Sequence, residues 1–166
     1  MKVSVPEVTP AACITSMSNG PTKTEVGVQD VPVVIDTSIL IDGRLLELCK
    51  TGFLSTSLVV PRFVLDELQR LADSAEPAKR ERGRRGLDLL NEIKGHKEMS
   101  LTLHDTPTDD DAPVDARLIR LAQLLQARLL TNDSGLARVA RLEGLAVLNL
   151  HELSRALQAT VLTGDE

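Results

Sequence analysis

Five short runs of β-branched and aliphatic residues alternate with segments of helical periodicity along the chain. Such runs are typical of buried strands, and they lie at residues 33–35, 57–60, 99–103, 128–131 and 146–148. Amphipathic patterns predict helices between and after them: to about residue 50, over 61–73 and 77–96, from 113 to about 125, from about 136 to 144 and from 149 to about 158. Because this alternation favours parallel pairing, the sequence predicts a three-layer α/β fold, with helices on both faces of a mainly parallel five-stranded sheet.

Composition limits the kinds of partner that the chain can bind. Of its 166 residues, 42% are hydrophobic and 26% are charged, but the only aromatic residues are Phe53 and Phe63. A surface that stacks nucleic-acid bases needs exposed aromatic rings, so that class of site is unlikely. The formal net charge is −5, so a polyanion would need a local basic patch or bound cations to bind here.

The cysteines and the first residues of the chain suggest no further chemistry. Cys13 and Cys49 lie far apart and have no paired spacing, so we expect neither a disulfide framework nor a zinc site. No run approaches the length of a membrane span, which predicts a cytoplasmic protein. Residues 1–30 carry several prolines and weak periodicity, and are interpreted as a loosely ordered leader to a domain over 31–166.

Four carboxylates follow four of the five predicted strands. Asp36 ends the first strand, and Asp133 lies just beyond the fourth. Glu67 lies on the apolar row of the helix after the second strand, and Asp115 lies in the first turn of the helix after the third. Because the carboxyl ends of parallel strands share one edge of a sheet, we expect these four side chains to converge there.

Three of the four carboxylates also have a simpler explanation. Asp36 could be a turn or capping residue, and Asp115 could only complement the dipole of its helix. Glu67 could lie at the edge of the apolar row and reach water. The four carboxylates together favour a binding site over these alternatives. Two unit charges at ~4 Å repel by about 4 kcal/mol even at an effective dielectric constant of ~20, so a cluster of four is costly unless protons or cations occupy it. Mg²⁺ or Mn²⁺ suits such a cluster of oxygen ligands, and we expect one or two ions.

A basic run interrupts this acidic chain. Five basic residues and Glu81 give the segment a local charge of +4, and the basic residues are Lys79, Arg80, Arg82, Arg84 and Arg85. A run of this kind is usually a solvated helix face, but its position in an acidic protein favours a contact with nucleic-acid phosphates. Gly83 and Gly86 weaken the helical prediction within the same segment.

At these residues the chain resembles a PIN domain. The resemblance rests on Val-Ile-Asp-Thr-Ser at 34–38, Pro-Arg-Phe-Val-Leu-Asp-Glu-Leu-Gln at 61–69, Val-Asp-Ala-Arg-Leu at 114–118 and Leu-Thr-Asn-Asp at 130–133. It is similar more narrowly to the PIN–TRAM (YacL-like) branch through Ile-Asp-Gly-Arg at 41–44, Leu-Ala-Asp-Ser at 71–74, the Arg-Gly-Arg-Arg-Gly-Leu-Asp-Leu-Leu run at 82–90 and Val-Leu-Asn-Leu at 147–150. That branch usually continues into an RNA-binding TRAM domain, for which this chain is too short, and often carries membrane helices upstream.

The resemblance implies a metal-dependent ribonuclease whose catalytic and metal-binding residues are Asp36, Glu67, Asp115 and Asp133. Polar neighbours would orient these carboxylates, namely Thr37, Ser38, Thr131 and Asn132. We therefore expect hydrolysis of RNA, or of structured DNA, without a nucleotide cofactor. The chain could form a homo-oligomer, and a membrane would be involved only if a longer parent chain carried upstream helices.

Three other functions stay open at this point. A non-catalytic nucleic-acid-binding module could retain the acidic residues without cleaving its ligand. A ribonuclease toxin of a toxin–antitoxin pair shares the fold, although the motif at 79–90 counts against it. A phospho-acceptor or phosphatase domain would also place an aspartate after the first strand, but its second aspartate and its lysine have no match here.

Overall fold

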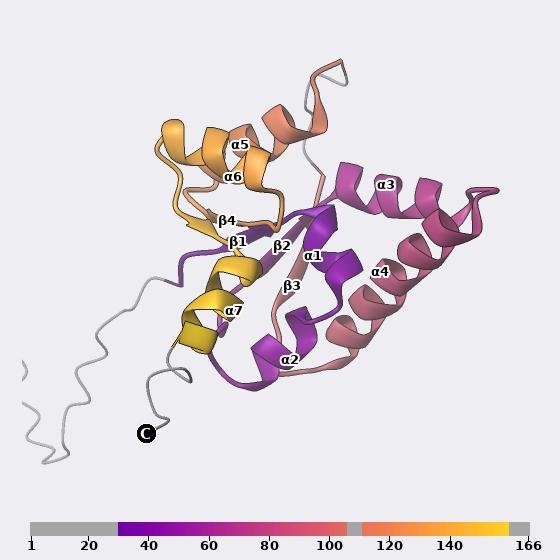
Figure 1. Ribbon diagram of the computed structural model, residues 1–166, viewed down its shortest axis with the longest axis horizontal. Helices are drawn as coiled ribbons and strands as arrows, with labels where there is room; N and C mark the ends of the chain where they lie inside the picture. The colour runs from indigo at the N-terminus through magenta and orange to yellow at the C-terminus, as the bar shows by residue number, and fades with distance from the viewer. Residues whose placement is uncertain (1–29, 106–110, 160–166) are drawn as a thin grey trace, which may run out of the picture.

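A parallel five-stranded sheet forms the centre of the protein. The computed structural model describes residues 30–105 and 111–159, so all but Asp30 of the predicted leader lies outside the described residues. The strands pair in the order β3-β2-β1-β4-β5, and every pairing is parallel. Their bounds are β1 Val33–Ile35, β2 Leu58–Pro61, β3 Leu101–His104, β4 Arg128–Leu130 and β5 Val147–Leu148. The predicted parallel α/β fold is confirmed (Figure 1).

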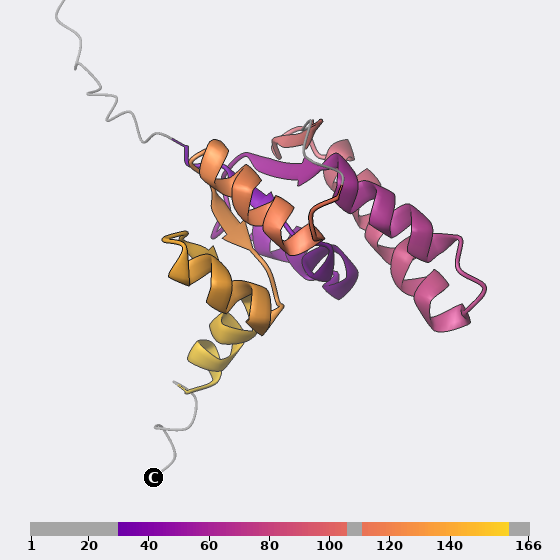
Figure 2. The same ribbon diagram turned by 90° about the horizontal axis from the view of Figure 1, so that it is seen from above.

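Helices cover both faces of this sheet. They are α1 Thr37–Asp42, α2 Leu45–Lys50, α3 Arg62–Ala72, α4 Pro77–Gly95, α5 Val114–Leu124, α6 Ser134–Leu142 and α7 Leu150–Ala159. Right-handed crossovers from β1 to β2 and from β2 to β3 place α1 to α4 on one side. The chain then reverses direction across the sheet, so α5 and α6 lie on the other side (Figure 2).

Burial on both faces of the sheet explains why the central strands are so apolar. All three residues of β1 are fully buried. In the adjacent β4, Leu129 is fully buried and Leu130 is almost fully buried. A strand that is covered on both faces reads as a continuous apolar run, which is the pattern seen in the sequence.

Among the described helices, none is both long enough and apolar enough to cross a membrane.

The structure corrects several local predictions. The single helix expected up to residue 50 is two short helices, because Gly43 adopts a left-handed conformation with φ of 86° and ends α1. Asp36 occupies the N-cap position of α1, but its side chain does not bond the backbone of that helix. Pro61 ends β2 and is the N-cap residue of α3, whereas the sequence placed it as the first helical residue.

Gly83 and Gly86, which weakened the prediction of α4, allow this helix to pack closely on α3. A Cβ atom on Gly83 would lie 2.2 Å from the backbone nitrogen of Ala72. A Cβ atom on Gly86 would lie 2.6 Å from Cδ2 of Leu68. The glycines therefore let α4 lie against the backbone of α3, and α3 is the helix that carries Glu67.

Replacing Gly83 by Ala tests this close packing. The added methyl group meets backbone atoms that cannot rotate away, so Gly83→Ala should lower the free energy of unfolding by about 1–3 kcal/mol. Gly95→Ala is the matched control, because it lies on the same helix and its Cβ would meet nothing within 4 Å. Chemical denaturation measures both variants, and equal stability of the two would contradict the close contact.

Candidate functional site

All four predicted carboxylates lie at the carboxyl edge of the sheet. Asp36 directly follows β1, and Asp133 is the N-cap residue of α6 after β4. Glu67 lies on α3, which follows β2, and Asp115 lies in the first turn of α5. The direction of the chain reverses between β1 and β4, and this switch point is where parallel α/β sheets bind ligands. These four carboxylates are called the acidic rim below.

The charges of the acidic rim act on one another. Burial raises the pKa of Asp115 above its ordinary value of 3.8, and the charges of Asp133, Asp36 and Glu67 raise it further. The two helices that carry Glu67 and Asp115 also contact each other, because Cζ of Arg117 on α5 lies 4.2 Å from the centre of the Phe63 ring on α3. The structure thus brings together all four side chains that the sequence predicted to converge.

Asp36 is the most firmly held member of the acidic rim. Its side chain accepts hydrogen bonds at Oδ2 from Ser38 Oγ at 2.6 Å and from Thr131 Oγ1 at 2.8 Å. Asp36 is 8% exposed and Thr131 is fully buried. Thr131 Oγ1 also accepts from the backbone N–H of Asp133 at 3.0 Å. One buried hydroxyl therefore connects the carboxylate of Asp36 with the backbone of Asp133.

Glu67 and Asp133 are oriented by different donors. Thr37 Oγ1 donates to Oε2 of Glu67 at 2.7 Å, so this half-buried carboxylate is tied to the start of α1. Asp133 accepts at Oδ1 from the backbone N–H groups of Gly135 at 2.7 Å and Leu136 at 3.0 Å. Asp133 is therefore a structural cap of α6 as well as a member of the acidic rim.

Each of these three carboxylates engages only one oxygen within the described part of the chain. The hydrogen bonds reach Oδ2 of Asp36, Oε2 of Glu67 and Oδ1 of Asp133. Among the described residues, none donates to the second oxygen of any of them. Anchoring one oxygen fixes the side-chain conformation and leaves the other able to bind a ligand.

The donor set of the acidic rim fits a hard divalent cation. It consists of carboxylate oxygens surrounded by hydroxyl groups, which suits Mg²⁺ or Mn²⁺ better than softer metals. Within residues 30–105 and 111–159, no three His, Cys, Asp or Glu side chains already lie close enough to surround one ion directly. Mg²⁺ usually keeps several of its waters and takes only one or two carboxylates, so an ion bound largely through water agrees with this spacing.

Asn132 has a different set of partners from the one expected. It does not contact a carboxylate of the acidic rim. Its Nδ2 donates to Asp42 Oδ2 at 3.1 Å, and its Oδ1 accepts from the backbone N–H of Leu150 at 3.2 Å. Asp42 was not among the predicted site residues, although it belongs to the Ile-Asp-Gly-Arg motif at 41–44.

The basic run lies on α4, and much of its charge is already paired. Lys79 pairs with Glu76 at 2.7 Å, Arg85 pairs with Glu81 at 3.2 Å, and Arg80 donates to the Ser74 carbonyl. Arg80, Arg84 and Arg85 line a hollow of about 560 Å³ together with the acidic side chains Glu81, Asp88 and Glu92. In the part of the chain that the structure describes, Arg82 and Arg84 form no ion pair. A phosphate contact on α4 stays a prediction, and these two arginines are its best candidates.

The raised pKa of Asp115 predicts a pH-dependent gain in stability on its neutralisation. Because the pKa is higher in the folded state, the charged carboxylate disfavours the fold, and protonation removes this penalty. Without metal, Asp115→Asn should therefore be more stable than the parent protein at pH 7. The difference should shrink as the pH falls toward 4. Urea denaturation of both proteins between pH 7 and 4.5 measures it, and a difference that does not vary with pH would contradict the interaction.

Comparisons with known proteins agree with this geometry. The family described as PIN domain matches residues 33–142. The PIN and TRAM-domain containing protein YacL of Bacillus subtilis is 44% identical over 133 residues, which cover 80% of this chain and 36% of that protein. The PIN and TRAM-domain containing protein slr1972 of Synechocystis is 47% identical over 134 residues, which cover 81% of this chain and 37% of that protein. The chain thus spans little more than a third of the length of these relatives.

The fold has a matching solved structure as well. A domain of a functionally unknown protein from Methanocaldococcus jannaschii superposes with a TM-score of 0.61 and 25% sequence identity, over 72% of this chain and 90% of that domain. The PIN fold is in general that of metal-dependent nucleases. By the match to the family over most of the described domain, the chain belongs to the PIN domain family.

Proposed function

We propose that the protein is a metal-dependent nuclease that hydrolyses phosphodiester bonds of RNA at the acidic rim. The observation that carries this proposal is the convergence of four carboxylates from four separate strand–helix units, where burial and the charges of the other three raise the pKa of Asp115. Nothing in the core of the fold requires such a cluster. Its repulsion is a cost that a bound cation removes, and it gives a metal site a physical reason to exist.

Asp36, Glu67, Asp115 and Asp133 would hold one or two Mg²⁺ or Mn²⁺ ions. When bound, such ions supply an activated water and neutralise the charge of the attacked phosphate. Because a metal-activated water would be the attacking group, no side-chain nucleophile is required, and the carboxylates would serve as ligands. Of the four, Asp36 is best placed to be the common ligand, because it is the most buried and the most firmly oriented.

The hydroxyl groups keep the ligand oxygens in place before any ion binds. Ser38 and Thr131 hold Oδ2 of Asp36, and Thr37 holds Oε2 of Glu67. Because these donors are themselves buried or half-buried, the carboxylates cannot rotate freely toward solvent. Such preorganisation lowers the reorganisation that metal binding and the reaction require.

Backbone groups at the same edge favour a negatively charged substrate. Helices α3, α5 and α6 all begin at the carboxyl edge of the sheet, so their N-terminal N–H groups point toward it. These positive helix ends partly offset the charge of the acidic rim and support a phosphate beside it. Arg82 and Arg84 on α4 would bind the phosphate backbone farther from the cleaved bond.

The choice of RNA follows from the resemblance to PIN ribonucleases, and structured DNA is the main competing substrate. The test is incubation of the protein with labelled RNA and DNA, single-stranded and duplex, with Mn²⁺, with Mg²⁺ or with a chelator. We expect cleavage of RNA that stops when the metal is chelated. Cleavage of DNA alone would overturn the choice of substrate.

Asp36→Asn should reduce metal-dependent cleavage by more than about 100-fold. Loss of a group that only orients a metal ligand costs up to about 100-fold in activity, and the loss of a ligand itself should cost more. Asp66→Asn is the matched control, because Asp66 lies next to Glu67 but is exposed and only loosely paired with Arg62, at 3.8 Å. The control should cleave at the parent rate. Binding of nucleic acid without cleavage by the parent protein would favour the non-catalytic binding module.

A further inference from the structure

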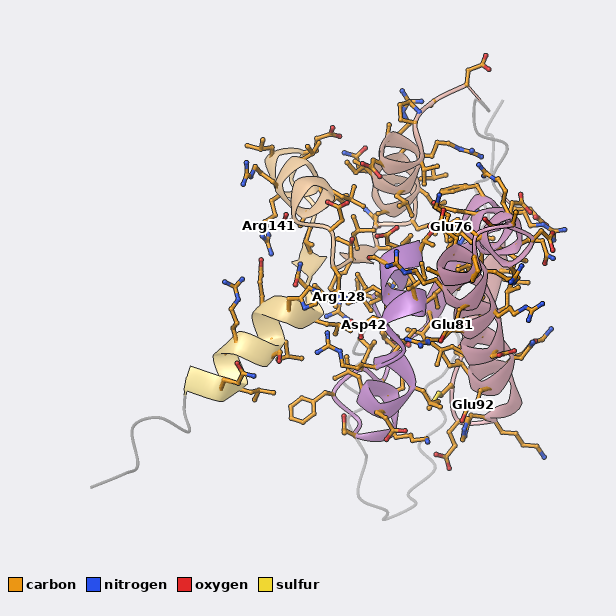
Figure 3. All side chains as sticks on the ribbon, turned by 45° about the vertical axis from the view of Figure 1, so that its right-hand side comes forward. Asp42, Glu76, Glu81, Glu92, Arg128 and Arg141 are labelled. Atoms are coloured by element: carbon orange, nitrogen blue, oxygen red, sulfur yellow. The ribbon has the colours of Figure 1, made fainter. Side chains whose placement is uncertain are left out.

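Asp42, which is partly buried, forms an ion pair with the exposed Arg44 beside the acidic rim. It is the last residue of α1, and the left-handed Gly43 turns the chain so that Arg44 folds back onto it. Arg44 donates from Nε to Oδ1 at 2.6 Å and from Nη2 to Oδ2 at 2.8 Å. The side chain of Asp42 is only 15% exposed, and the bond from Arg44 lowers its pKa below the ordinary value of 3.8. In the view of Figure 3, Asp42 lies beside α1, on the side toward α7.

Asn132 connects this ion pair to the loop of the acidic rim. Its side chain lies between Asp42 and the start of α7, through the bonds to Asp42 Oδ2 and from the Leu150 N–H. Its backbone N–H donates to Ser38 Oγ at 3.0 Å, and Ser38 in turn donates to Asp36. Asn132 is therefore the point where α1, the loop after β4 and α7 meet.

We infer that Asp42 is a positioning residue for the acidic rim: through Asn132 it fixes the loop 131–133, and thereby holds Thr131 and Asp133 in place. The inference deepens the proposed function and rests on it. Neither Asp42 nor Arg44 is a ligand or contacts substrate in this account. The effect of Asp42 and Arg44 passes through the side-chain amide of Asn132 to its neighbours in sequence, Thr131 and Asp133.

The chemistry of the contact explains why position 42 carries a carboxylate. The Oδ1 atom of Asn132 is occupied by the Leu150 N–H, so its NH₂ group must find an acceptor. A carboxylate offers only acceptors and fixes the amide in this orientation, whereas an amide at position 42 could also present a competing donor. Arg44 neutralises the carboxylate, so Asp42 does not add a fifth negative charge to the acidic rim.

Two variants, each lacking one partner of the bond between Asn132 and Asp42, separate a positioning role from a purely structural one. Asp42→Ala removes the acceptor, and Asn132→Ala removes the amide but leaves the pair between Asp42 and Arg44 intact. The control is Glu47→Ala, which removes an exposed carboxylate that pairs with Lys50 at 3.0 Å on the neighbouring α2. If one of the first two variants fails to fold, the other still tests the contact.

Two readouts on the folded proteins decide the outcome. In metal-free protein, exchange of the backbone amides at position 132 and at Leu150 should become several-fold faster in both variants and stay unchanged in the control. In calorimetric titration, the dissociation constant for Mn²⁺ should then rise roughly tenfold. This is the low end of the loss of metal affinity expected when a residue that orients a metal ligand is removed. In cleavage assays kcat should fall while the KM for RNA stays near that of the parent.

Each contrary result has its own meaning. A lower melting temperature with unchanged exchange at these two amides and unchanged Mn²⁺ affinity would make Asp42 a purely structural residue and overturn the inference. A parent protein that neither binds Mn²⁺ nor cleaves nucleic acid would overturn the proposed function. In that case, the exchange data alone would still decide whether Asp42 holds the loop.

Discussion

Mutual repulsion among four carboxylates at one edge of the sheet is the constraint on which the rest of the structure depends. Parallel pairing forces all strand ends to this edge, and the reversal between β1 and β4 opens it to a ligand. Buried hydroxyls and backbone N–H groups hold one oxygen of each of Asp36, Glu67 and Asp133. The fold thus fixes a concentration of negative charge that it does not itself neutralise, and this charge adds to the effect of burial in raising the pKa of Asp115.

The outer helices serve the same edge in a less obvious way. Glu67 lies on α3, more than a turn beyond the end of β2, so its position depends on how α3 lies against the sheet. Gly83 and Gly86 let α4 pack directly on α3 and fix that helix from outside. The ion pair of Asp42 with Arg44 has a comparable role for the loop after β4. Residues outside the acidic rim therefore set its geometry, through contacts that carry no chemistry of their own.

The sequence predicted the elements and the acidic rim because both depend on local pattern and on one rule of topology. Apolar runs identify the buried strands, and the shared edge of a parallel sheet places Asp36 near Asp133 without any contact information. The resemblance named Thr131 as an orienting residue but not Asp36 as its partner, and the bond from Asn132 to Asp42 was not predicted. Both bonds depend on side-chain conformations across 95 and 90 residues of sequence, which the strand pattern does not specify. It also misjudged Gly83, since a glycine required by a neighbouring helix reads locally as a helix breaker.

Thermal melting of the parent protein, Asp133→Asn and Asp133→Ala, each with chelator and with Mn²⁺, tests the metal centre most directly. At about 100 times its dissociation constant, Mn²⁺ should stabilise the parent by roughly 2.7 kcal/mol, which is about 5–10 °C in melting temperature. Asn caps a helix as well as Asp does, so Asp133→Asn should match or exceed the parent without metal but gain less from Mn²⁺. Asp133→Ala should also lose about 1 kcal/mol of cap stability. An Asp133→Asn protein that keeps the full shift with Mn²⁺ would contradict the account.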